Sequence, residues 1–353
     1  MARPDTIVVG GGVVGLAVAY ELRQAGQAVL VLEQGHLGRG SSGVGGGFVS
    51  LLSQQSPAML GLVRESSKRY ASVAERLGAD IGLRSCGSLL LAPSEAELTI
   101  LHTAGGELSA LGLSATVITG DSLRELEPCV APTVVAALEV DSDLQIDPVR
   151  LLHAYRDALV REGGEVREGR LVAGLQRHGG RVTGVRTQYG DIDADQVVLA
   201  TGCWTPVLMP PTHAAFVRPR RGQLLVARPR RRCVQHLLLG ADYLGAKFTN
   251  TTIGFSLEQT VDGVVRLGGT REWSGFDPRP TALLCSVQKN AARHVVLGDL
   301  EWSHAVAGLR PATADGLPLI GSLGKGLWIA TGHEGSGFAT APATAARLAA
   351  AIT

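Results

Sequence analysis

Cysteine is scarce in this sequence, and the few cysteines form no pattern that binds a metal. They are odd in number, include no C-x-x-C pair and lie far apart, at Cys86, Cys129, Cys203, Cys233 and Cys285. Local spacing therefore supplies neither an iron–sulfur cluster nor a zinc site, and we expect no bound metal. Scattered cysteines of this kind fit a reducing compartment, so we expect a cytoplasmic protein.

The sequence also lacks a charge excess and a long apolar run. Its 33 basic and 32 acidic residues give a net charge of +1, so nothing favours nucleic acid or an anionic membrane surface as a partner. No stretch reaches the roughly 18 apolar residues of a membrane-spanning helix, so we expect no integral membrane segment, although a peripheral position at the inner face of a membrane stays open. The first strand is predicted within about five residues of the N-terminus, so we expect no cleaved signal peptide.

The opening stretch, residues 6–34, is the most informative part of the chain. With 353 residues, of which 45% are hydrophobic, the chain is long enough for a large core and for two domains. Residues 7–9 predict a buried parallel strand, residues 16–24 a helix, and residues 28–32 a second strand that ends in Glu33. Between the first strand and the helix, three glycines stand at G-x-G-x-x-G spacing: Gly10, Gly12 and Gly15.

Each part of this strand–helix–strand unit has a physical task in binding a dinucleotide. The first glycine permits the tight turn, the second lets the backbone approach a pyrophosphate, and the third lets helix and strand pack closely. The helix N-terminus offers N–H groups to phosphates, and Glu33 can accept hydrogen bonds from a ribose 2′-OH while repelling a 2′-phosphate. We therefore predict a dinucleotide site; the alternative is a glycine-rich turn in an ordinary βαβ unit.

Three later segments show the same pattern, in which glycines follow the end of a predicted strand. The loop at residues 37–50 carries Ser41 and Ser42 and predicts a second cofactor loop, with a flexible loop as the alternative. Residues 197–200 predict a buried strand that ends in Thr201-Gly202, where ligands of open α/β sheets bind. Near the C-terminus, a strand at 327–330 and a glycine-rich turn precede a helix whose N-terminus can stabilise negative charge at the pyrimidine edge of a reduced flavin.

Between these segments the pattern indicates a second, more mixed domain. Helices are predicted at 57–77, 94–111 (capped by Ser94), 120–128 and 148–162, and strands at 86–92, 165–168, 170–177 and 181–188. Residues 206–302 are strand-rich, with a hairpin turn at Asp262-Gly263. We assign 1–50, 140–205 and 303–353 to a discontinuous cofactor domain, and 51–139 and 206–302 to a substrate or partner domain.

An arginine-rich run covers residues 218–233. We interpret it as a solvated or subunit-facing edge. Nucleic-acid binding is the alternative, disfavoured by the neutral overall charge and by the lack of aromatic residues among the arginines.

Four motifs in this order resemble the FAD-dependent amino-acid and amine oxidases of the D-amino acid oxidase superfamily, the group that includes glycine oxidase and sarcosine oxidase. They are GGGVVGLAVAYEL with Glu33, SSGVGGGF, VVLATGCW, and AGLRPATADGLPLIG with GHEGSGFATAP, and the resemblance covers nearly the whole chain. It implies an α/β plus α+β fold, with a discontinuous Rossmann-like FAD-binding domain and a mixed-sheet substrate domain. No cysteine stands just before the RPATADG segment, so the implied FAD is non-covalent.

The resemblance also implies which residues contact FAD. Val172 would present backbone groups to the adenine, Glu33 with Gln34 would lie at the ribose, and Gly335 to Phe338 would meet the flavin ring. The complete set of expected cofactor contacts is Gly10, Gly12, Val13, Val14, Gly15, Glu33, Gln34, Ser41, Ser42, Gly46, Gly47, Phe48, Val172, Ala200, Thr201, Gly202, Trp204, Gly308, Arg310, Gly335, Ser336, Gly337 and Phe338.

Arg310, in the GLRP motif, is the residue that this resemblance assigns to the substrate carboxylate. The chemistry agrees, because a planar guanidinium binds a carboxylate bidentately; the alternative is an arginine that caps the neighbouring turn. Phe48 and Ser256 are further expected substrate contacts. The chain departs from glycine oxidase in two places: Gly335 replaces an expected second carboxylate-binding arginine, and Ser256 stands where a tyrosine is expected.

The implied reaction is oxidation of the C–N bond of an amino acid or secondary amine, with hydride transfer to flavin and hydrolysis of the imine. Arg310, Glu258 and His333 are the candidate catalytic residues; Glu258, His333 and Glu334 would tune amine protonation, and each has an alternative as a hydrogen-bonded loop or strand residue.

A finer resemblance, in residues 255–277 and GHEGSGFATAP, is to the FAD subunits of heteromeric dye-linked dehydrogenases: hydroxyproline or proline dehydrogenase, opine oxidases and hydrogen cyanide synthase. It implies a substrate of hydroxyproline, proline, opine or sarcosine type and a partner subunit with an iron–sulfur cluster or a second nucleotide cofactor. The alternatives are a stand-alone glycine or D-amino acid oxidase that uses O₂, a nicotinamide dehydrogenase, and a non-catalytic FAD-bearing subunit.

Overall fold

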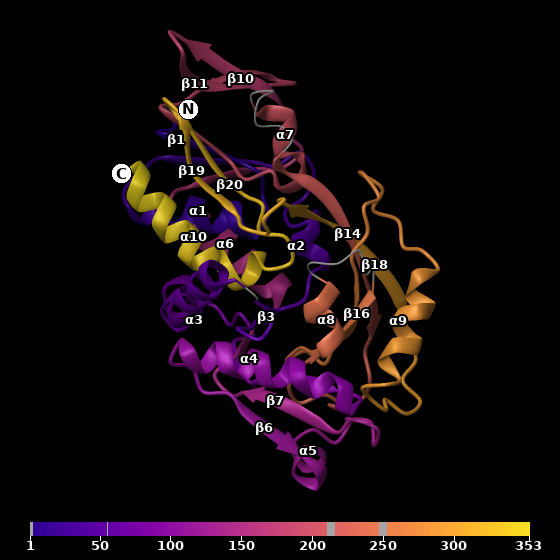
Figure 1. The fold of residues 1–353 in the computed structure, drawn as a ribbon. Coiled ribbons are helices and arrows are strands. Elements are labelled where there is room, and N and C mark those ends of the chain that lie inside the picture. Colours follow the sequence, from indigo (N-terminus) through magenta and orange to yellow (C-terminus); the bar gives the residue numbers. More distant parts are fainter. Residues whose placement is uncertain (1–2, 55, 210–215, 247–252) are drawn as a thin grey trace.

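The protein folds around two large sheets that meet at the middle of the molecule (Figure 1). The computed structural model describes residues 3–54, 56–209, 216–246 and 253–353. Within these residues, no helix is both long and apolar enough to cross a membrane.

The first sheet has six strands and contains the opening βαβ unit. Its order is β19-β20-β13-β1-β2-β9, parallel except for the edge strand β19. Val9 lies beside both Leu32 and Leu199, so the carboxyl ends of β2, β1 and β13 share one edge. The strands are β1 (Thr6–Val9), β2 (Val29–Leu32), β9 (Glu165–Arg167), β13 (Gln196–Leu199), β19 (Leu319–Gly324) and β20 (Leu327–Thr331).

The two faces of this sheet bury alternate residues, as the period of two requires. Val8 and Val31 pack against helices, and the cluster continues through Tyr20, Tyr70 and Tyr155. Ile7, Val9 and Leu32 face a small antiparallel sheet instead. Each large apolar side chain buried here contributes roughly 1.5–3 kcal/mol. The helices are α1 (Val13–Gln24), α3 (Pro57–Leu77), α6 (Pro148–Arg161) and α10 (Gly337–Ile352); the small sheet is β10 (Val172–His178), β11 (Arg181–Thr187) and β12 (Gly190–Asp193).

The second sheet has eight strands in the order β18-β14-β17-β16-β15-β5-β7-β6 and is mixed, because β15 pairs with β5 in parallel. Its strands are β5 (Ser88–Ala92), β6 (Thr116–Thr119), β7 (Ala136–Val140), β14 (Arg218–Ala227), β15 (Leu237–Gly240), β16 (Ile253–Gln259), β17 (Val265–Thr270) and β18 (His304–Ala312). The helices α4 (Leu98–Ala110), α5 (Gly120–Leu126), α8 (Ala241–Ala246) and α9 (Leu283–Ala291) belong to this half.

Short elements connect the two halves. The strands β3 (Phe48–Val49), β4 (Arg84–Ser85) and β8 (Leu144–Gln145) form a small sheet in which β8 lies between the other two. The single-turn helices α2 (Ser41–Val44) and α7 (Thr205–Leu208) follow β2 and β13 as the chain leaves the first sheet. The segment from Ser41 to Val49 therefore runs from the first sheet to this small sheet.

Most helices and strands lie where the sequence places them, with several local differences. The elements that were not predicted include the strands β3, β6, β7, β8, β12, β18 and β19 and the helices α2, α7, α8 and α9. Ser94 makes no capping bond to the backbone; its hydroxyl donates to Glu97 Oε2 over 2.8 Å, and a 3₁₀ turn at Glu95–Glu97 precedes α4. Helix α5 begins at Gly120, as expected, and ends at Leu126, two residues earlier than expected.

The edge interpretation of the arginine-rich run is wrong for its first half. Strand β14 lies between β18 and β17, and Arg220 and Arg221 are only 8% and 6% exposed. Arg221 pairs with Glu272 at 2.7 Å, which makes its burial tolerable. Arg228 and Arg230, beyond the strand, are exposed as expected.

Two elements pack across the domain division drawn from the sequence. Helix α3 shares the core of the first half through Tyr70, Val73 and Leu77, and strand β18 pairs with β14 in the second sheet. The division into 1–50, 140–205 and 303–353 against 51–139 and 206–302 stays a prediction.

Candidate functional site

A large cavity lies at the carboxyl edge of the first sheet, where the strand ends of the opening unit converge. Its volume is about 640 Å³, within the usual range for a cofactor site. Most of the predicted cofactor residues line it: Gly10, Gly12, Val13, Val14, Glu33, Gln34, Ser41, Ser42, Val172, Ala200, Thr201, Gly202, Trp204, Gly308 and Gly337.

Gly10 makes the turn that opens this cavity. Its φ is +112°, and a Cβ at this position would lie 2.4 Å from the carbonyl oxygen of Ala200. Gly15 does not line the cavity; a Cβ there would lie 2.1 Å from the Gly10 carbonyl oxygen. Gly10 therefore permits the tight turn and Gly15 the close packing of α1 on the strand ends, as the fingerprint predicts for the first and third glycines.

The N-terminus of α1 presents amide groups to the cavity. Gly12 precedes the helix without a side-chain cap, and the first turn contains no acidic residue. The Val13 amide donates to Ser42 Oγ over 3.1 Å, whereas no acceptor among the described residues meets the amides of Gly12 and Val14. Helix N-termini of this kind bind phosphate oxygens, so this end of the cavity fits a pyrophosphate.

Glu33 is held rigidly at the end of β2. One carboxylate oxygen accepts the Gly11 amide over 2.7 Å and the other accepts the Gly35 amide over 2.8 Å. Each oxygen retains acceptor capacity, and the residue lines the large cavity. The carboxylate is therefore oriented in advance to accept hydrogen bonds from ribose hydroxyls. Together with the amides at α1, this geometry fits FAD.

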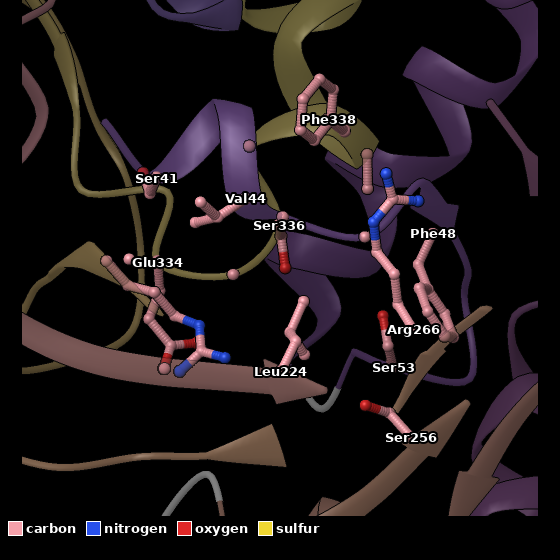
Figure 2. A pocket seen from close by; sticks show the side chains of 18 of the residues that line it. Ser41, Val44, Phe48, Ser53, Leu224, Ser256, Arg266, Glu334, Ser336 and Phe338 are labelled. Atoms are coloured by element: carbon pink, nitrogen blue, oxygen red, sulfur yellow. The ribbon is translucent and has the colours of Figure 1, made fainter. Parts of the chain in front are cut away.

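A smaller cavity of about 120 Å³ adjoins the first and shares Val13, Ser41, Ser42 and Gly308 with it. Figure 2 shows Phe48 and Arg266 on one side of this cavity, Ser41 and Glu334 on the other, and Ser336 and Leu224 between them. The predicted residues that it brings together are Gly46, Phe48, Ser256, Glu258, Arg310, Gly335, Ser336, Gly337 and Phe338.

Arg310 reaches this smaller cavity from β18. Its guanidinium lies against the backbone of the neighbouring strand, because a Cβ at Gly222 would lie 2.1 Å from Arg310 Cζ. Nη1 donates to the carbonyl oxygen of Thr270 over 2.7 Å. Burial, and then the charge of nearby Arg271, lower the pKa of Arg310. The arginine thus donates to the end of β17 and lines the small cavity.

Glu334 is the acidic partner of several arginines at this end of the cavity. It has a φ of +47°, and its amide donates to the Pro311 carbonyl oxygen over 3.0 Å. Its carboxylate lies 3.2 Å from Arg271 Nε and 3.6 Å from Arg220 Nη1. One carboxylate thus stands among three guanidiniums, and this end of the cavity is positively charged.

Glu258 anchors the glycine loop from the opposite end. Its side chain has no exposed surface, and its carboxylate accepts the Gly47 amide at 3.0 and 3.1 Å and the Gln145 side-chain amide at 2.8 Å. Arg266 Nη1 lies 3.4 Å from the same carboxylate. Burial raises the pKa of Glu258. These contacts fit the interpretation of Glu258 as a hydrogen-bonded strand residue.

His333 lies apart from the other catalytic candidates. It lines the larger cavity, is buried, and forms a hydrogen bond between Nε2 and Thr344 Oγ1 over 3.1 Å. Burial lowers the pKa of His333 to about 4, so the ring is neutral at physiological pH. The structure therefore does not bring His333 together with Arg310 and Glu258.

The residues of the small cavity that were missed from the sequence include Tyr243, Arg266 and Arg271. Tyr243 and Arg271 lie within three residues of the ends of β15 and β17, so strand-end position was the usable signal. Arg266 lies within β17, where nothing in one sequence says which face it occupies. Among the described residues, no group of His, Cys, Asp and Glu side chains is arranged to hold a metal ion.

Comparisons with known proteins agree with this geometry. The family model described as "DAO: FAD dependent oxidoreductase" matches residues 5–351. The chain is 32% identical to a glycine oxidase of Pseudomonas putida, over 96% of this chain and 92% of that protein. It is 26% identical to the hydrogen cyanide synthase subunit HcnC of Pseudomonas aeruginosa, over 96% and 90%.

Solved structures resemble it over almost their full length. The glycine oxidase of Geobacillus kaustophilus has a TM-score of 0.89 at 26% identity, with 100% of this chain and 95% of that chain covered. The L-proline dehydrogenase of P. horikoshii has a TM-score of 0.89 at 24% identity, with 99% and 93% covered, and this likeness concerns the fold alone.

Proposed function

The chain belongs to the DAO family of FAD-dependent oxidoreductases, and from this premise we propose that it oxidises the C–N bond of a small amine that carries a carboxylate. Membership confirms three predictions from the sequence: the family resemblance, the Rossmann-like fold with mixed sheets, and FAD as the cofactor. The individual contacts to FAD and the substrate assignment remain proposals.

The observation that carries the proposal is the place of Arg310. Its guanidinium faces a small cavity that opens from the cofactor cavity, beside the turn that precedes α10. Arg271 and Arg220 add positive charge there, and Glu334 compensates only one of the three. A buried cationic site of small volume selects an anionic ligand, and a guanidinium pairs best with a carboxylate.

The residues of the small cavity would orient the amine for oxidation. FAD, when bound, supplies the two-electron acceptor for the C–N oxidation. Arg310 would hold the carboxylate, which points the α-carbon away from the sheet, while Phe48 and Leu224 form apolar walls that exclude water. The backbone amides of Gly335 and Gly337, next to the N-terminus of α10, would stabilise negative charge on the cofactor side.

No residue of the small cavity is arranged as a free general base. Glu258 is occupied by the Gly47 amide and by Gln145, and Glu334 is paired with arginines. We therefore propose that the amine reacts in its neutral form, as a neutral amine can lose a hydride without a base. Activity should then rise with pH as the amine of the substrate loses its proton.

Two versions of the reaction differ in the electron acceptor. Two relatives, at 32% and 30% identity, are named glycine oxidases, which supports a stand-alone oxidase that passes electrons to O₂. The relative named as a subunit of hydrogen cyanide synthase supports transfer to a partner subunit. We place the oxidase first. Purified protein that consumes oxygen with substrate would support it, whereas turnover only with an artificial dye would support the partnered dehydrogenase.

The proposed reaction is tested by anaerobic reduction of the bound flavin. The purified holoenzyme is mixed without oxygen with glycine, sarcosine, proline, hydroxyproline, D-amino acids and opines, and the visible flavin band is followed. We expect bleaching by at least one carboxylate-bearing amine and none by the matching amine without its carboxylate. If dithionite bleaches the flavin but none of the amines does, the proposed function is wrong.

A further inference from the structure

Arg271 is a second buried guanidinium beside Arg310 in the small cavity. It follows the last residue of β17, and its side chain is 3% exposed. Nε lies 3.2 Å from Glu334 Oε1, and the guanidinium carbon lies 4.4 Å from the centre of the Tyr243 ring. The ion pair and the ring contact fix the plane of the guanidinium.

One nitrogen of this guanidinium has no protein partner. Arg271 Nη2 is buried and makes no hydrogen bond among the described residues. A buried donor of a charged group that remains unpaired is strongly unfavourable, so such groups in native proteins generally meet a ligand, an ion or water. The nitrogen therefore indicates an acceptor that binds in the cavity, and the positive surroundings favour an anionic one.

The side chain that is absent at position 335 leaves room for this arrangement. A Cβ at Gly335 would lie 3.4 Å from Arg310 Nε, so a longer side chain at this turn would compete for the space around Arg310. The resemblance to glycine oxidase implies a second carboxylate-binding arginine at this turn, and this chain has Gly335 there instead. In this chain a guanidinium reaches the small cavity from the second sheet instead, because Arg271 follows the last residue of β17.

We propose that Arg271 is a second carboxylate-binding residue, which shares the substrate carboxylate with Arg310. Glu334 holds Arg271 through Nε, so that Nη2 is directed at the bound carboxylate. This inference rests on the proposed function and deepens it. It makes the site selective against amines without a carboxylate, because these would leave a buried charged donor unpaired.

The test measures the binding of a carboxylate ligand that has no amine and therefore cannot be oxidised. Acetate is titrated into holoenzyme carrying Arg271→Gln, and the dissociation constant is read from the visible flavin spectrum, with neutral acetamide as the ligand control. We expect the dissociation constant for acetate to rise about 10- to 100-fold, the range for hydrogen bonds to charged groups, and that for acetamide to change little. KM for the amine substrate should rise with it, while kcat changes less.

Arg218→Gln is the matched control variant. Arg218 belongs to β14, stacks on Trp273 at 4.8 Å and is exposed, so its loss removes one positive charge near the site without touching the cavity. Acetate binding by this variant should stay within about twofold of wild type, because an exposed charge is screened by solvent. If Arg218→Gln weakens acetate as much as Arg271→Gln, general electrostatics explains the effect and the proposal is overturned.

A second variant, Arg271→Lys, is measured in case the Arg271→Gln protein does not retain FAD. Arg271→Lys keeps the positive charge but lacks the planar fork, so acetate should bind more weakly than in wild type. Unchanged acetate affinity in a flavin-loaded Arg271 variant would overturn the proposal, even if amines bleach the wild-type flavin. Failure of every amine to bleach the wild-type flavin would instead refute the proposed function, and Arg271-dependent acetate binding would still stand.

Discussion

Glu258 and Gly47 join the two halves of the protein through one amide that lies 3.0 and 3.1 Å from the two oxygens of a single carboxylate. Gly47 belongs to the glycine loop beside the cofactor cavity, and Glu258 to β16 of the second sheet. The carboxylate has no exposed surface. The contact therefore fixes the distance between the glycine loop and the strands of the second sheet that line the small cavity.

Glu258→Ala should loosen this junction. It removes the acceptor of the buried Gly47 amide and of the Gln145 side chain and leaves Arg266 without its carboxylate, at a cost of about 3–5 kcal/mol in the free energy of unfolding. Urea unfolding of the apoprotein measures this change. FAD affinity, read by fluorescence during cofactor titration, should fall as well. Wild-type stability with wild-type FAD affinity would contradict the structural role.

Gly10→Ala should abolish tight FAD binding. A Cβ here meets the Ala200 carbonyl oxygen at 2.4 Å, and the φ of +112° is unfavourable for alanine. Gly26→Ala is the control, because its φ of +87° imposes strain, while a Cβ there has no neighbour within 4 Å. The FAD-to-protein ratio after purification should drop for Gly10→Ala and stay near wild type for Gly26→Ala. Equal ratios in the two variants would mean that the turn does not position the cofactor.

His333 should make the folded state sensitive to acid. Burial lowers the pKa of His333 to about 4, below the value of about 6.5 in the unfolded chain. As pH falls from about 6.5 to about 4, the unfolded chain binds a proton that the folded chain does not, so stability is complete above this window and is lost within it, by about 3 kcal/mol. His333→Asn should reduce this loss between pH 7 and pH 4.5 in urea unfolding. An identical pH dependence in both proteins would show that the ring titrates normally.

The opening βαβ unit was predictable from sequence because its determinants are local. Gly10, Gly15 and Glu33 act within about 25 residues of chain through turn geometry, packing and a strand end. Arg310 was placed in the substrate site only through the family resemblance, and the structure adds the reason: Gly222 on the paired strand leaves room for its guanidinium.

The remaining site residues depend on strand pairing, which one sequence does not specify. Tyr243 and Arg271 come together because β15, β16 and β17 are neighbours in the second sheet, although 27 positions separate the two residues in numbering. Arg220 was predicted to be solvated. The alternation of residues along a strand shows that the strand has two faces, but it does not show which face is buried. His333 was grouped with Arg310 by its motif, whereas its ring packs against α10.

The central claim is that Arg310 holds the carboxylate of an amine beside the flavin, and anaerobic flavin reduction in Arg310→Ala holoenzyme tests it most directly. The amine concentration that half-maximally bleaches the flavin should rise about 100-fold or more, because a buried charge-assisted pair is lost, while the FAD content stays intact. Bleaching by the same amine at the wild-type concentration, in a variant with full FAD content, would contradict the account.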